Sequence, residues 1–422
     1  MPLSSGSGTV RAPRISSAPG TFAREKASRT VYIAGAGIAG MTLALALARF
    51  DMKVVILEKN PGIQTEGAGL QISPNARHVL NRLDLDAALQ QTGFEPQAID
   101  VYPFHARKPL ISLQMGDIAN ERFGAPYIVI HRADLADALH AACRRFANID
   151  IQFSIRNFDM QTHARGLSVT YELKSGDYVT ARPFAFVGAD GVHSPTRTRV
   201  LAGPPATYSG YVAWRALVPV SLLDSRFNLE RTSLLWAPGF HAVTYPHPHR
   251  HLMNIALFSK EKLDRRTRVK RVEAPTIPET VFSSPRISAI LAAAEAGWQK
   301  WPLYAVSTPR WYKGPVGLIG DAAHAMLPYQ AQGAAMAIED AGVLAPLLAR
   351  CEHAEQAFQT CYQLRRRRVQ RVVKTSATNG IIYHAGWPLT IARNLVVKLQ
   401  GPTGHLKRLA WIYGHDVATD TQ

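Results

Sequence analysis

The chain has 422 residues, of which 47% are hydrophobic and 19% charged, so it has the composition of an ordinary globular protein in one large or two closely joined domains. This length excludes a small chain that cannot bury a core. Lysine and arginine outnumber acidic residues by 48 to 31, which gives a net charge of +17. Such an excess indicates an anionic partner: nucleic acid, a membrane surface, or an acidic substrate or cofactor.

Three basic runs carry part of this charge. They are RTR at 197–199, RRTRVKR at 265–271 and RRRRVQR at 365–371. We expect them to form solvated surface rather than a nucleic-acid footprint, because no zinc-ligand spacing, RNA-binding sheet motif or alternation of aromatic and basic residues accompanies them.

Targeting signals are weak. Residues 1–28 are rich in Ser, Pro, Gly and Arg, with Glu25 the only acid, so we expect a disordered arm, with a transit peptide as the alternative. Residues 31–48 are uncharged and long enough to suggest a membrane span, but their regular glycine spacing argues against one. The odd number of cysteines and the absence of a C-x-x-C pair favour a reducing, cytoplasmic compartment. The cysteines are Cys143, Cys351 and Cys361.

Residues 30–58 predict a strand, a helix and a second strand around the motif GAGIAG. Gly35 permits the tight turn, Gly37 lets a pyrophosphate approach the backbone, and Gly40 lets the helix pack on the strand. The phosphates would lie at the positive end of the helix dipole. Glu58 ends the second strand and would accept hydrogen bonds from both ribose hydroxyls, whether the dinucleotide is FAD or NAD. The neighbouring residues predicted to bind this cofactor are Ala36, Ile38, Ala39 and Lys59.

The remaining elements alternate between helical and sheet-like segments. We expect mixed helix and loop to about residue 130, and then the following: a helix at 132–146, a strand at 167–173, a buried strand within 178–191, a sheet over 208–260 with a hairpin turn at PHPHR, strand, loop and helix after 310, and basic helices over 343–415. The order predicts an α/β plus α+β protein, in which a sheet-rich insert interrupts a dinucleotide-binding fold.

Two further segments follow predicted strands. FVGADGVHSPTR at 186–197, taken alone, fits any turn from strand to helix. GLIGDAAHAMLPYQAQGAAMAIEDAG at 317–342 places an acid at a strand end, ahead of a helix that opens with small side chains.

Several segments together resemble the class A flavin-dependent monooxygenases, the aromatic hydroxylases, and are most similar to their salicylate-hydroxylase-like branch. The resemblance covers residues 30–415 and rests on GAGIAG, GAGLQISPNARHVLNRL at 67–83, HRADL at 131–135, GADGVHSPTR at 188–197, GDAAHAMLPYQAQGAAMAIEDA at 320–341 and WIYGHD at 411–416. It implies a Rossmann-like FAD-binding domain, a sheet-rich substrate domain and a helical C-terminal part. Their expected ranges are 29–100, 125–205 and 310–350 for the first, 101–124 and 206–309 for the second, and 351–422 for the third.

The resemblance also implies flavin contacts. Asp321 would accept a hydrogen bond from a ribityl hydroxyl, and the helix start at Gly333 and Ala334 would direct N–H groups at the N1/C2-carbonyl edge of the flavin. A helix N-terminus there stabilises the negative charge of reduced flavin. Arg132 is expected near the flavin and its linker. Three more residues are expected along the cofactors: Gly69 and Gln71 beside the flavin, and Asp190 near both FAD and the nicotinamide nucleotide.

On the substrate side, alternation places His241, Val243 and Tyr245 on one face of a strand. The resemblance implies that this strand covers the substrate, so we expect His241 to be the base that deprotonates a phenol, because an imidazole titrates near neutral pH. Tyr245 would hydrogen-bond the substrate or His241. The carbonyl of Pro328 is a candidate substrate contact, and Arg215 either binds an anionic substrate or forms a structural salt bridge.

No metal site is predicted. His247, His249 and His251 lie in the predicted turn, where we expect them to be exposed rather than to bind a metal, because their spacing fits no common catalytic metal motif.

The resemblance implies an FAD-dependent, NAD(P)H-using monooxygenase. It would hydroxylate a small phenolic or N-heteroaromatic substrate, with or without a carboxylate, using molecular oxygen through a flavin C4a-hydroperoxide. We expect a monomer or homodimer with no stable nucleic-acid or membrane partner. The alternatives are an oxidoreductase or epoxidase of the same fold acting on a non-aromatic substrate, and a basic binding protein without turnover.

Overall fold

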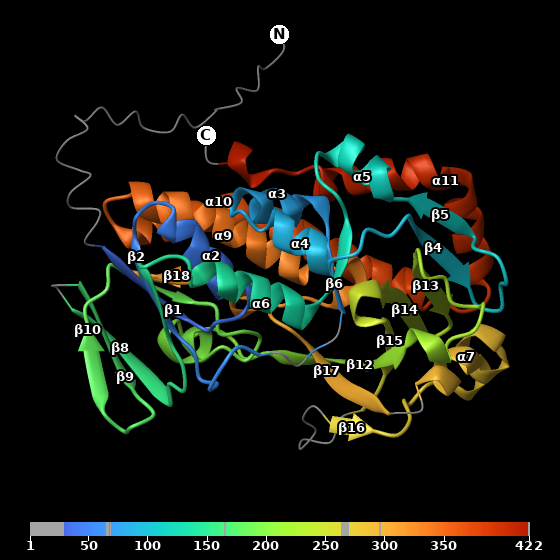
Figure 1. Cartoon of the computed structure of the whole chain (residues 1–422), viewed down its shortest axis with the longest axis horizontal. Helices are drawn as coiled ribbons and strands as arrows, with labels where there is room; N and C mark the ends of the chain where they lie inside the picture. The colour runs from blue at the N-terminus through green and yellow to red at the C-terminus, as the bar shows by residue number, and fades with distance from the viewer. Residues whose placement is uncertain are drawn as a thin grey trace, which may run out of the picture.

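The computed structural model describes residues 29–64, 67, 69–163, 166–262, 270–294 and 297–420. The expected arm at 1–28 and most of the basic run at 265–271 lie outside these residues. Two large sheets stand at opposite ends of the molecule, with long helices laid along one side of both (Figure 1). The expected fold class, α/β plus α+β with a helical C-terminal part, is confirmed.

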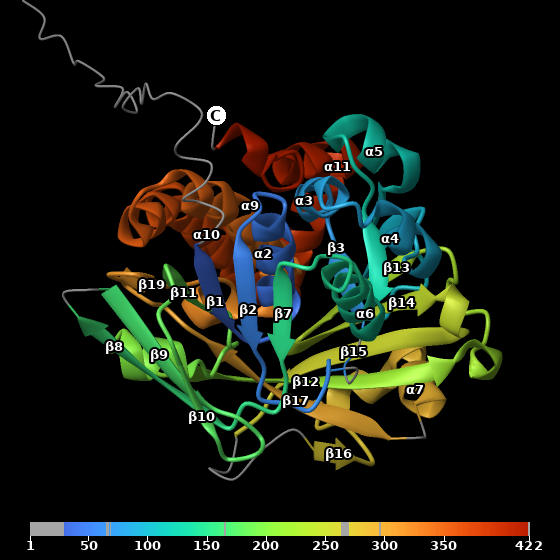
Figure 2. The ribbon, with the colours of Figure 1, turned by 60° about the vertical axis from the view of Figure 1, so that its left-hand side comes forward.

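The first sheet has six strands in the order β18-β19-β11-β1-β2-β7, parallel except for β18. Figure 2 shows β1, β2 and β7 side by side with α2 next to them. The inner strands are almost wholly apolar because both faces of the sheet are covered. The strands are β1 (Thr30–Ala34), β2 (Lys53–Leu57), β7 (Ile149–Gln152), β11 (Ala185–Gly188), β18 (Tyr312–Lys313) and β19 (Val316–Leu318).

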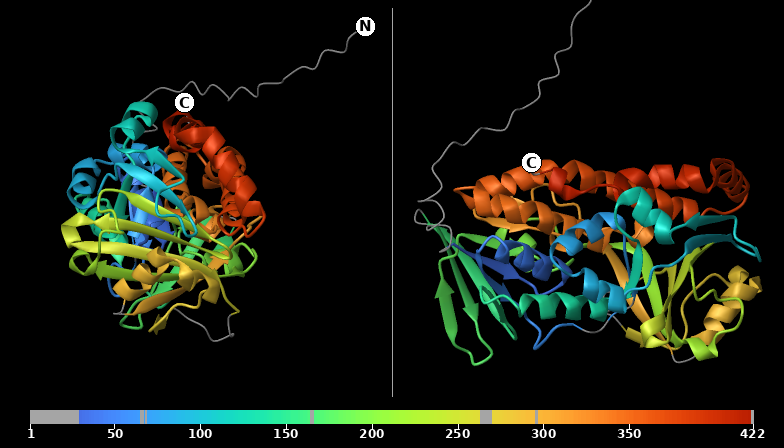
Figure 3. Two further views of the ribbon diagram at one scale, coloured as in Figure 1. Left: turned by 90° about the vertical axis from the view of Figure 1, so that its right-hand side faces the viewer. Right: turned by 45° about the horizontal axis from the view of Figure 1, so that its top comes forward.

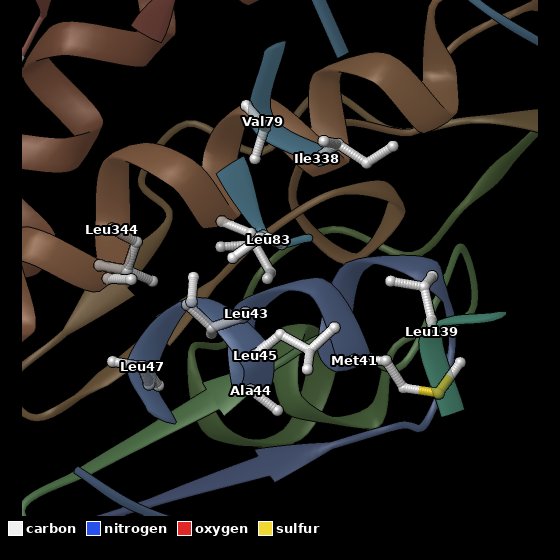
Figure 4. Packing of buried hydrophobic residues seen from close by; sticks show 14 of the residues in the cluster. Met41, Leu43, Ala44, Leu45, Leu47, Val79, Leu83, Leu139, Ile338 and Leu344 are labelled. Carbon is white, nitrogen blue, oxygen red and sulfur yellow. The ribbon is translucent and has the colours of Figure 1, made fainter. Parts of the chain in front are cut away.

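Helices cover one face of this sheet. Figure 4 shows Leu43 and Leu47 of α2 near Leu344 of α9, and Met41 near Leu139 of α6, all within one buried cluster. These helices are α2 (Ile38–Ala48), α3 (Pro74–Arg82), α4 (Asp86–Thr92), α6 (Arg132–Cys143) and α9 (Gly333–Arg350). A three-stranded sheet packs on the other face, with the strands β8 (Asn157–His163), β9 (Gly166–Glu172) and β10 (Tyr178–Ala181).

The second sheet has eight strands in the order β16-β17-β12-β15-β14-β13-β4-β5. β14 and β15 form the expected hairpin, joined by a short 3-10 turn at Pro248–Arg250. The strands are β4 (Ala98–Pro103), β5 (Ile111–Gln114), β12 (Thr207–Pro219), β13 (Thr232–Ala237), β14 (Phe240–His247), β15 (Leu252–Lys260), β16 (Lys270–Val272) and β17 (Trp298–Ala305). Helix α7 (Pro285–Ala293) packs on its outer face.

Two long helices end the chain and run along one side of the molecule (Figure 3). They are α10 (Ala354–Tyr383) and α11 (Leu389–Tyr413). Helix α11 is interrupted at Gly401, whose φ of 59° is not helical and which precedes Pro402. Two short helices complete the fold, α5 (Gly116–Phe123) and α8 (Asp321–His324).

The interval from 59 to 130, expected to be helix and loop, contains four strands. β3 (Gly69–Ile72) pairs with β6 (Ile128–His131), and β4 joins the second sheet beside β13. Each strand has only four to six residues, and β3, β4 and β6 each have a partner far along the chain, so local alternation is too short to reveal them. β4 also crosses the expected boundary between residues 100 and 101, and the division into domains remains a prediction.

The expectation that the arginine runs form solvated surface is wrong for two of their members. Arg197 is fully buried and donates to the backbone oxygens of Val192, Pro204 and Ala322. Arg365 is also fully buried, between Glu339 and Asp340 of α9. A run of like charges can therefore contain internal residues when facing helices supply acidic partners.

The apolar stretch at 31–48 is not a membrane span. It forms β1, the glycine turn and α2. Among the helices that the structure describes, none is both long and apolar enough to cross a membrane.

Candidate functional site

The glycine motif lies at the carboxyl ends of the parallel strands, beside a cavity of about 810 Å³. Gly35 has a φ of 101°, and a Cβ there would lie 2.6 Å from the Ala189 oxygen. A Cβ on Gly40 would lie 2.0 Å from the Gly35 oxygen, whereas one on Gly37 would meet nothing within 4 Å. Gly35 and Gly40 are thus required by packing, and the open space at Gly37 leaves room for a ligand.

Glu58 is placed to hold this turn and to face the cavity. Its carboxylate is 7% exposed and accepts the Ala36 N–H at 2.8 Å and the Asn60 N–H at 2.9 Å. Lys59 and Asp190 also line the cavity. Asp190 accepts from the Thr196 N–H at 2.9 Å and its hydroxyl at 2.7 Å, which fixes the turn after β11.

The small residues around Gly320 let α8, α2 and α9 meet. Gly320 has a φ of 57°, and a Cβ there would lie 2.9 Å from Ala337 Cβ and 3.3 Å from Ala39 Cβ. The N–H of Gly320 donates to Asp340 at 3.0 Å. Ile38, at the first turn of α2, packs on the same core. The turn therefore delivers the next residue, Asp321, to a fixed place at the strand end.

Asp321 is solvent-accessible at the start of α8, yet protein atoms enclose it. This desolvation raises the pKa of the Asp321 carboxyl, and the charges of His324 and Arg132 offset only part of the rise. The Arg132 side chain also lies against Gly67, whose missing Cβ would be 3.0 Å from Arg132 Cδ. The fold thus brings Asp321 and Arg132, which are far apart in the sequence, close enough for the charge of Arg132 to act on the Asp321 carboxyl.

The start of α9 is held by buried polar side chains. Gln332, 2% exposed, precedes Gly333, donates to Ser73 at 2.8 Å and accepts from Asn75 at 3.1 Å. A Cβ on Gly333 would meet nothing within 4 Å, so there is open space beside the first residue of α9. A helix start of this kind suits an electron-rich group.

A second cavity, of about 990 Å³, lies between the eight-stranded sheet and the C-terminal helices. His241, Gln71 and Pro328 line it. Gln71 accepts the Tyr127 hydroxyl at 2.7 Å. The Pro328 carbonyl, expected to contact substrate, already accepts the Ala331 N–H at 3.0 Å, so one of its two lone pairs is occupied.

His241 is 2% exposed and its Nδ1 lies 2.8 Å from Nε2 of His384. Its ring stacks on Phe258 with centroids 4.3 Å apart, and Tyr329 and Tyr383 meet it edge-on at 5.3 and 5.4 Å. Burial, together with His384, lowers the pKa of His241 well below its ordinary value of 6.5. The expectation of a histidine that titrates near neutral pH is therefore wrong, and His241 is neutral there.

Tyr245 does not bond His241, although both face the same side of β14. A Cβ on Gly69 would lie 2.4 Å from the Tyr245 ring, which places this tyrosine against β3. Tyr245 is 4% exposed, and burial raises its pKa. Asn254 of β15 accepts the Gly69 N–H at 2.9 Å. This end of the sheet therefore fixes β3, the strand in which Gly69 and Gln71 are expected to lie beside the flavin.

Arg215 lies on the same face of the sheet as His241. It pairs with Ala256 of β15, and Ala256 pairs in turn with Val243 of β14. Its buried Nε has no hydrogen-bond partner among the described residues, and desolvation, with a further contribution from the charge of Arg132, lowers its pKa. It does not line the cavity beside His241. Its role in substrate binding remains a prediction.

The predicted exposure of the turn histidines is wrong for His247 and confirmed for His249 and His251. His247 is fully buried at the end of β14, and burial lowers its pKa to about 3. His249 and His251 are exposed, and the His249 ring lies 2.7 Å from the Asp134 carboxylate. Within the described part of the chain, no group of three potential metal ligands is assembled.

His384 and Tyr383, which enclose His241, were not predicted as site residues. They end α10, and His241 and His384 are 143 residues apart. A tyrosine and a histidine at a helix end carry no local signal, so only the packing of α10 on the sheet identifies them.

The first cavity, together with the residues around Asp321 and Gly333, fits FAD. The first offers an acid at a strand end, an open glycine turn and a helix N-terminus, which suit ribose and pyrophosphate. The accessible Asp321 and the open helix start at Gly333 suit a sugar-alcohol chain and an electron-rich ring. The glycine turn is open at Gly37, where a pyrophosphate must approach.

Comparisons with known proteins agree with this geometry. A family model described as FAD binding domain matches residues 28–376. A 3-hydroxybenzoate 6-hydroxylase of Aquipseudomonas alcaligenes is 32% identical over 388 residues, covering 92% of this chain and 98% of that protein. A 3-amino-4-hydroxybenzoate 2-monooxygenase of Streptomyces platensis is 30% identical, covering 92% and 96%. The structure of a salicylate hydroxylase substrate complex has a TM-score of 0.73 at 24% identity, covering 94% and 98%.

Proposed function

The chain belongs to the class A flavin-dependent aromatic hydroxylases, and from that premise we propose that it hydroxylates a phenolic ring bound in the cavity beside His241. It is an FAD-dependent monooxygenase. When bound, FAD supplies the oxygen chemistry, with electrons from NAD(P)H. The contribution of the protein is to position the ring, to exclude water and to move the phenolic proton.

The observation that carries this proposal is a pair of neutral imidazoles, of which His241 lines the cavity and His384 contacts His241. His384 has its pKa lowered to about 4, mainly by burial, so both rings of the 2.8 Å contact are neutral at pH 7. In the tautomer in which His241 Nδ1–H donates to His384, Nε2 of His241 is a free acceptor, and it bonds no other described residue. A phenol hydroxyl can donate to that nitrogen.

A buried imidazole with a low pKa is a weak base by itself. A phenolate forming at Nε2 would raise the pKa of His241, because an opposite charge favours the imidazolium form. His384 would stabilise that imidazolium by accepting its Nδ1 proton in a hydrogen bond. The base thus becomes effective only with substrate present, and ring activation is coupled to binding.

Apolar and aromatic residues form much of the remaining cavity wall. Leu234, Val243 and Trp236 come from the sheet, and Tyr383 from α10. Trp236 stacks on Tyr383 at 5.2 Å. Such a wall binds one flat ring by dispersion and keeps out water, which protects a reactive oxygen donor. The aromatic lining favours a phenol over the non-aromatic substrates of the alternative hypothesis.

A substrate screen tests the proposal. FAD-loaded protein is mixed with hydroxybenzoates and hydroxylated N-heteroaromatics, while NADH and NADPH oxidation, oxygen uptake and product mass are followed. We expect at least one ring to stimulate oxidation and gain one oxygen atom. His241→Ala should bind FAD but lose hydroxylated product at every pH. If no aromatic is hydroxylated, or if His241→Ala keeps full product yield, the proposal is refuted.

Three further points are part of the proposal. We infer no nucleic-acid partner, since arginines of two basic runs are internal. A monomer or homodimer, measurable by light scattering, and a cytoplasmic location are retained as predictions. Arg215 is retained as a candidate contact for an anionic group near Arg132, tested by comparing Arg215→Met with wild type in FAD and substrate binding.

A further inference from the structure

The cavity beside His241 continues past the sheet to helix α11, and the charged side chains that line it are all positive. None of the described lining residues is acidic. The lining cations are Arg371, Arg393, Lys407 and Arg408. An apolar cleft lined by charges of one sign raises the local concentration of oppositely charged ligands, so this cavity favours an anion.

Arg393 is the lining cation that contacts the aromatic wall next to His241. Its guanidinium lies 4.9 Å from the centre of the Trp236 ring, and Trp236 is the cross-strand partner of His241. Residues directly opposite in an antiparallel pair project on the same face as neighbours. Arg393 and His241 therefore lie on either side of the Trp236 position, and both line the same cavity.

Arg393 is held in this position without an acidic partner. Its Nη1 donates to the Ile382 carbonyl at 3.0 Å, and its Nε donates to Asn394 Oδ1 at 3.0 Å. Its Nη2 bonds no other described residue, and no described carboxylate pairs with it. Desolvation alone lowers the pKa of this half-buried arginine. These two hydrogen bonds fix the guanidinium group, and its remaining N–H groups can donate to an anionic ligand.

We propose that Arg393 binds the carboxylate of an aromatic carboxylate substrate and thereby orients the ring with its hydroxyl toward His241. This inference rests on the proposed function and narrows it to anionic phenols. The stacked pair of Trp236 and Tyr383 then supports the ring between the two polar ends. Arg215, which lies outside the cavity wall, does not serve as this anchor.

The test compares acids with their neutral amides. Dissociation constants of 3-hydroxybenzoate, 4-hydroxybenzoate and salicylate, and of the matching carboxamides, are measured from the change in flavin absorbance of FAD-loaded protein. The variants are Arg393→Met, Arg393→Lys and, as a matched control, Lys398→Met, because Lys398 is exposed on the same helix and does not line the cavity. Unchanged FAD content and unchanged amide binding show that each variant is folded.

Wild-type protein should bind at least one acid roughly 10- to 100-fold more tightly than its amide, as expected for hydrogen bonds to a charged group. Arg393→Met should abolish this preference and leave amide binding unchanged, Arg393→Lys should restore part of it, and Lys398→Met should keep it. Added salt should weaken acid binding only.

The outcomes separate the subsite from the proposed function. An acid preference that persists in Arg393→Met, or a wild type that binds amides as tightly as acids, overturns the subsite even when the ring is hydroxylated. An Arg393-dependent preference without any hydroxylated product supports the subsite and refutes the proposed function. A panel in which nothing binds contradicts both.

Discussion

Replacing Arg365 with leucine would leave two buried carboxylates with one partner fewer. Arg365 is fully buried, with Nη1 2.5 Å from Glu339 and Nε 2.9 Å from Asp340. Glu339 keeps Arg368 at 2.6 Å, and Asp340 keeps His324 at 2.6 Å. The substitution therefore tests whether α9, which begins at the predicted flavin edge, depends on an internal charge of α10.

Removing one member of a buried ion pair costs about 3–5 kcal/mol of stability. Because each carboxylate retains a second partner, we expect a loss near the lower end, about 3 kcal/mol. The assay is urea unfolding of FAD-loaded protein followed by tryptophan fluorescence. Arg367→Leu is the matched control, since Arg367 lies on the same helix and is exposed; surface changes of this kind stay within about 0.5 kcal/mol.

The pH dependence sharpens this test. The partners of Asp340 lower its pKa to about 2, and those of Glu339 lower its pKa as well. A depressed folded-state pKa gives stability that is fully present above the unfolded-state value of about 4 and is lost as pH falls through the folded value. Loss of Arg365 removes one cation that lowers both pKa values while burial still raises them, so mild acid neutralises the less compensated charge. The difference between Arg365→Leu and wild type should shrink from pH 7 toward pH 4.

Equal unfolding midpoints for Arg365→Leu and Arg367→Leu at pH 7 would refute the reasoning. A stability difference that grows as the pH falls would contradict the assignment of buried carboxylates as its cause.

Three further predictions concern the cofactor and the base. Gly40→Ala should lower stability and FAD content together, because its Cβ would lie 2.0 Å from a backbone oxygen, whereas Gly37→Ala should fold with normal stability and bind FAD more weakly in fluorescence titrations; equal stability of the two variants would contradict this. Glu58→Gln should weaken FAD binding roughly tenfold by loss of charge-assisted hydrogen bonds, and an unchanged dissociation constant would remove Glu58 from the site. His241 should produce no inflection near pH 6.5 in kcat/KM, which reports the pKa values of the free enzyme, because its pKa lies well below that value; an inflection there that disappears in His241→Ala would show that the residue titrates normally.

Local patterns were sufficient for the nucleotide half of the site. The turn around Gly35 and Gly40 follows from steric limits within a few residues, and Glu58 follows from the length of the next strand. The hairpin and the common face of His241 and Val243 follow from strict alternation along β14. These features depend on backbone geometry that neighbouring residues determine, so they can be predicted without knowing the rest of the fold.

The chemistry of the second cavity depended on the tertiary structure. His241 pairs with His384, and both lose their ordinary pKa through burial that no local pattern encodes. Arg365, within a run of four arginines, is internal because α9 places acids opposite it, and Arg393 faces an aromatic ring of a distant strand. The amino-acid sequence by itself determined where a dinucleotide can bind. The packing of α10 and α11 on the sheet decided which side chains are neutral, which charges are paired and which cation is left for a ligand, because desolvation and Coulomb energies depend on neighbours brought together only by folding.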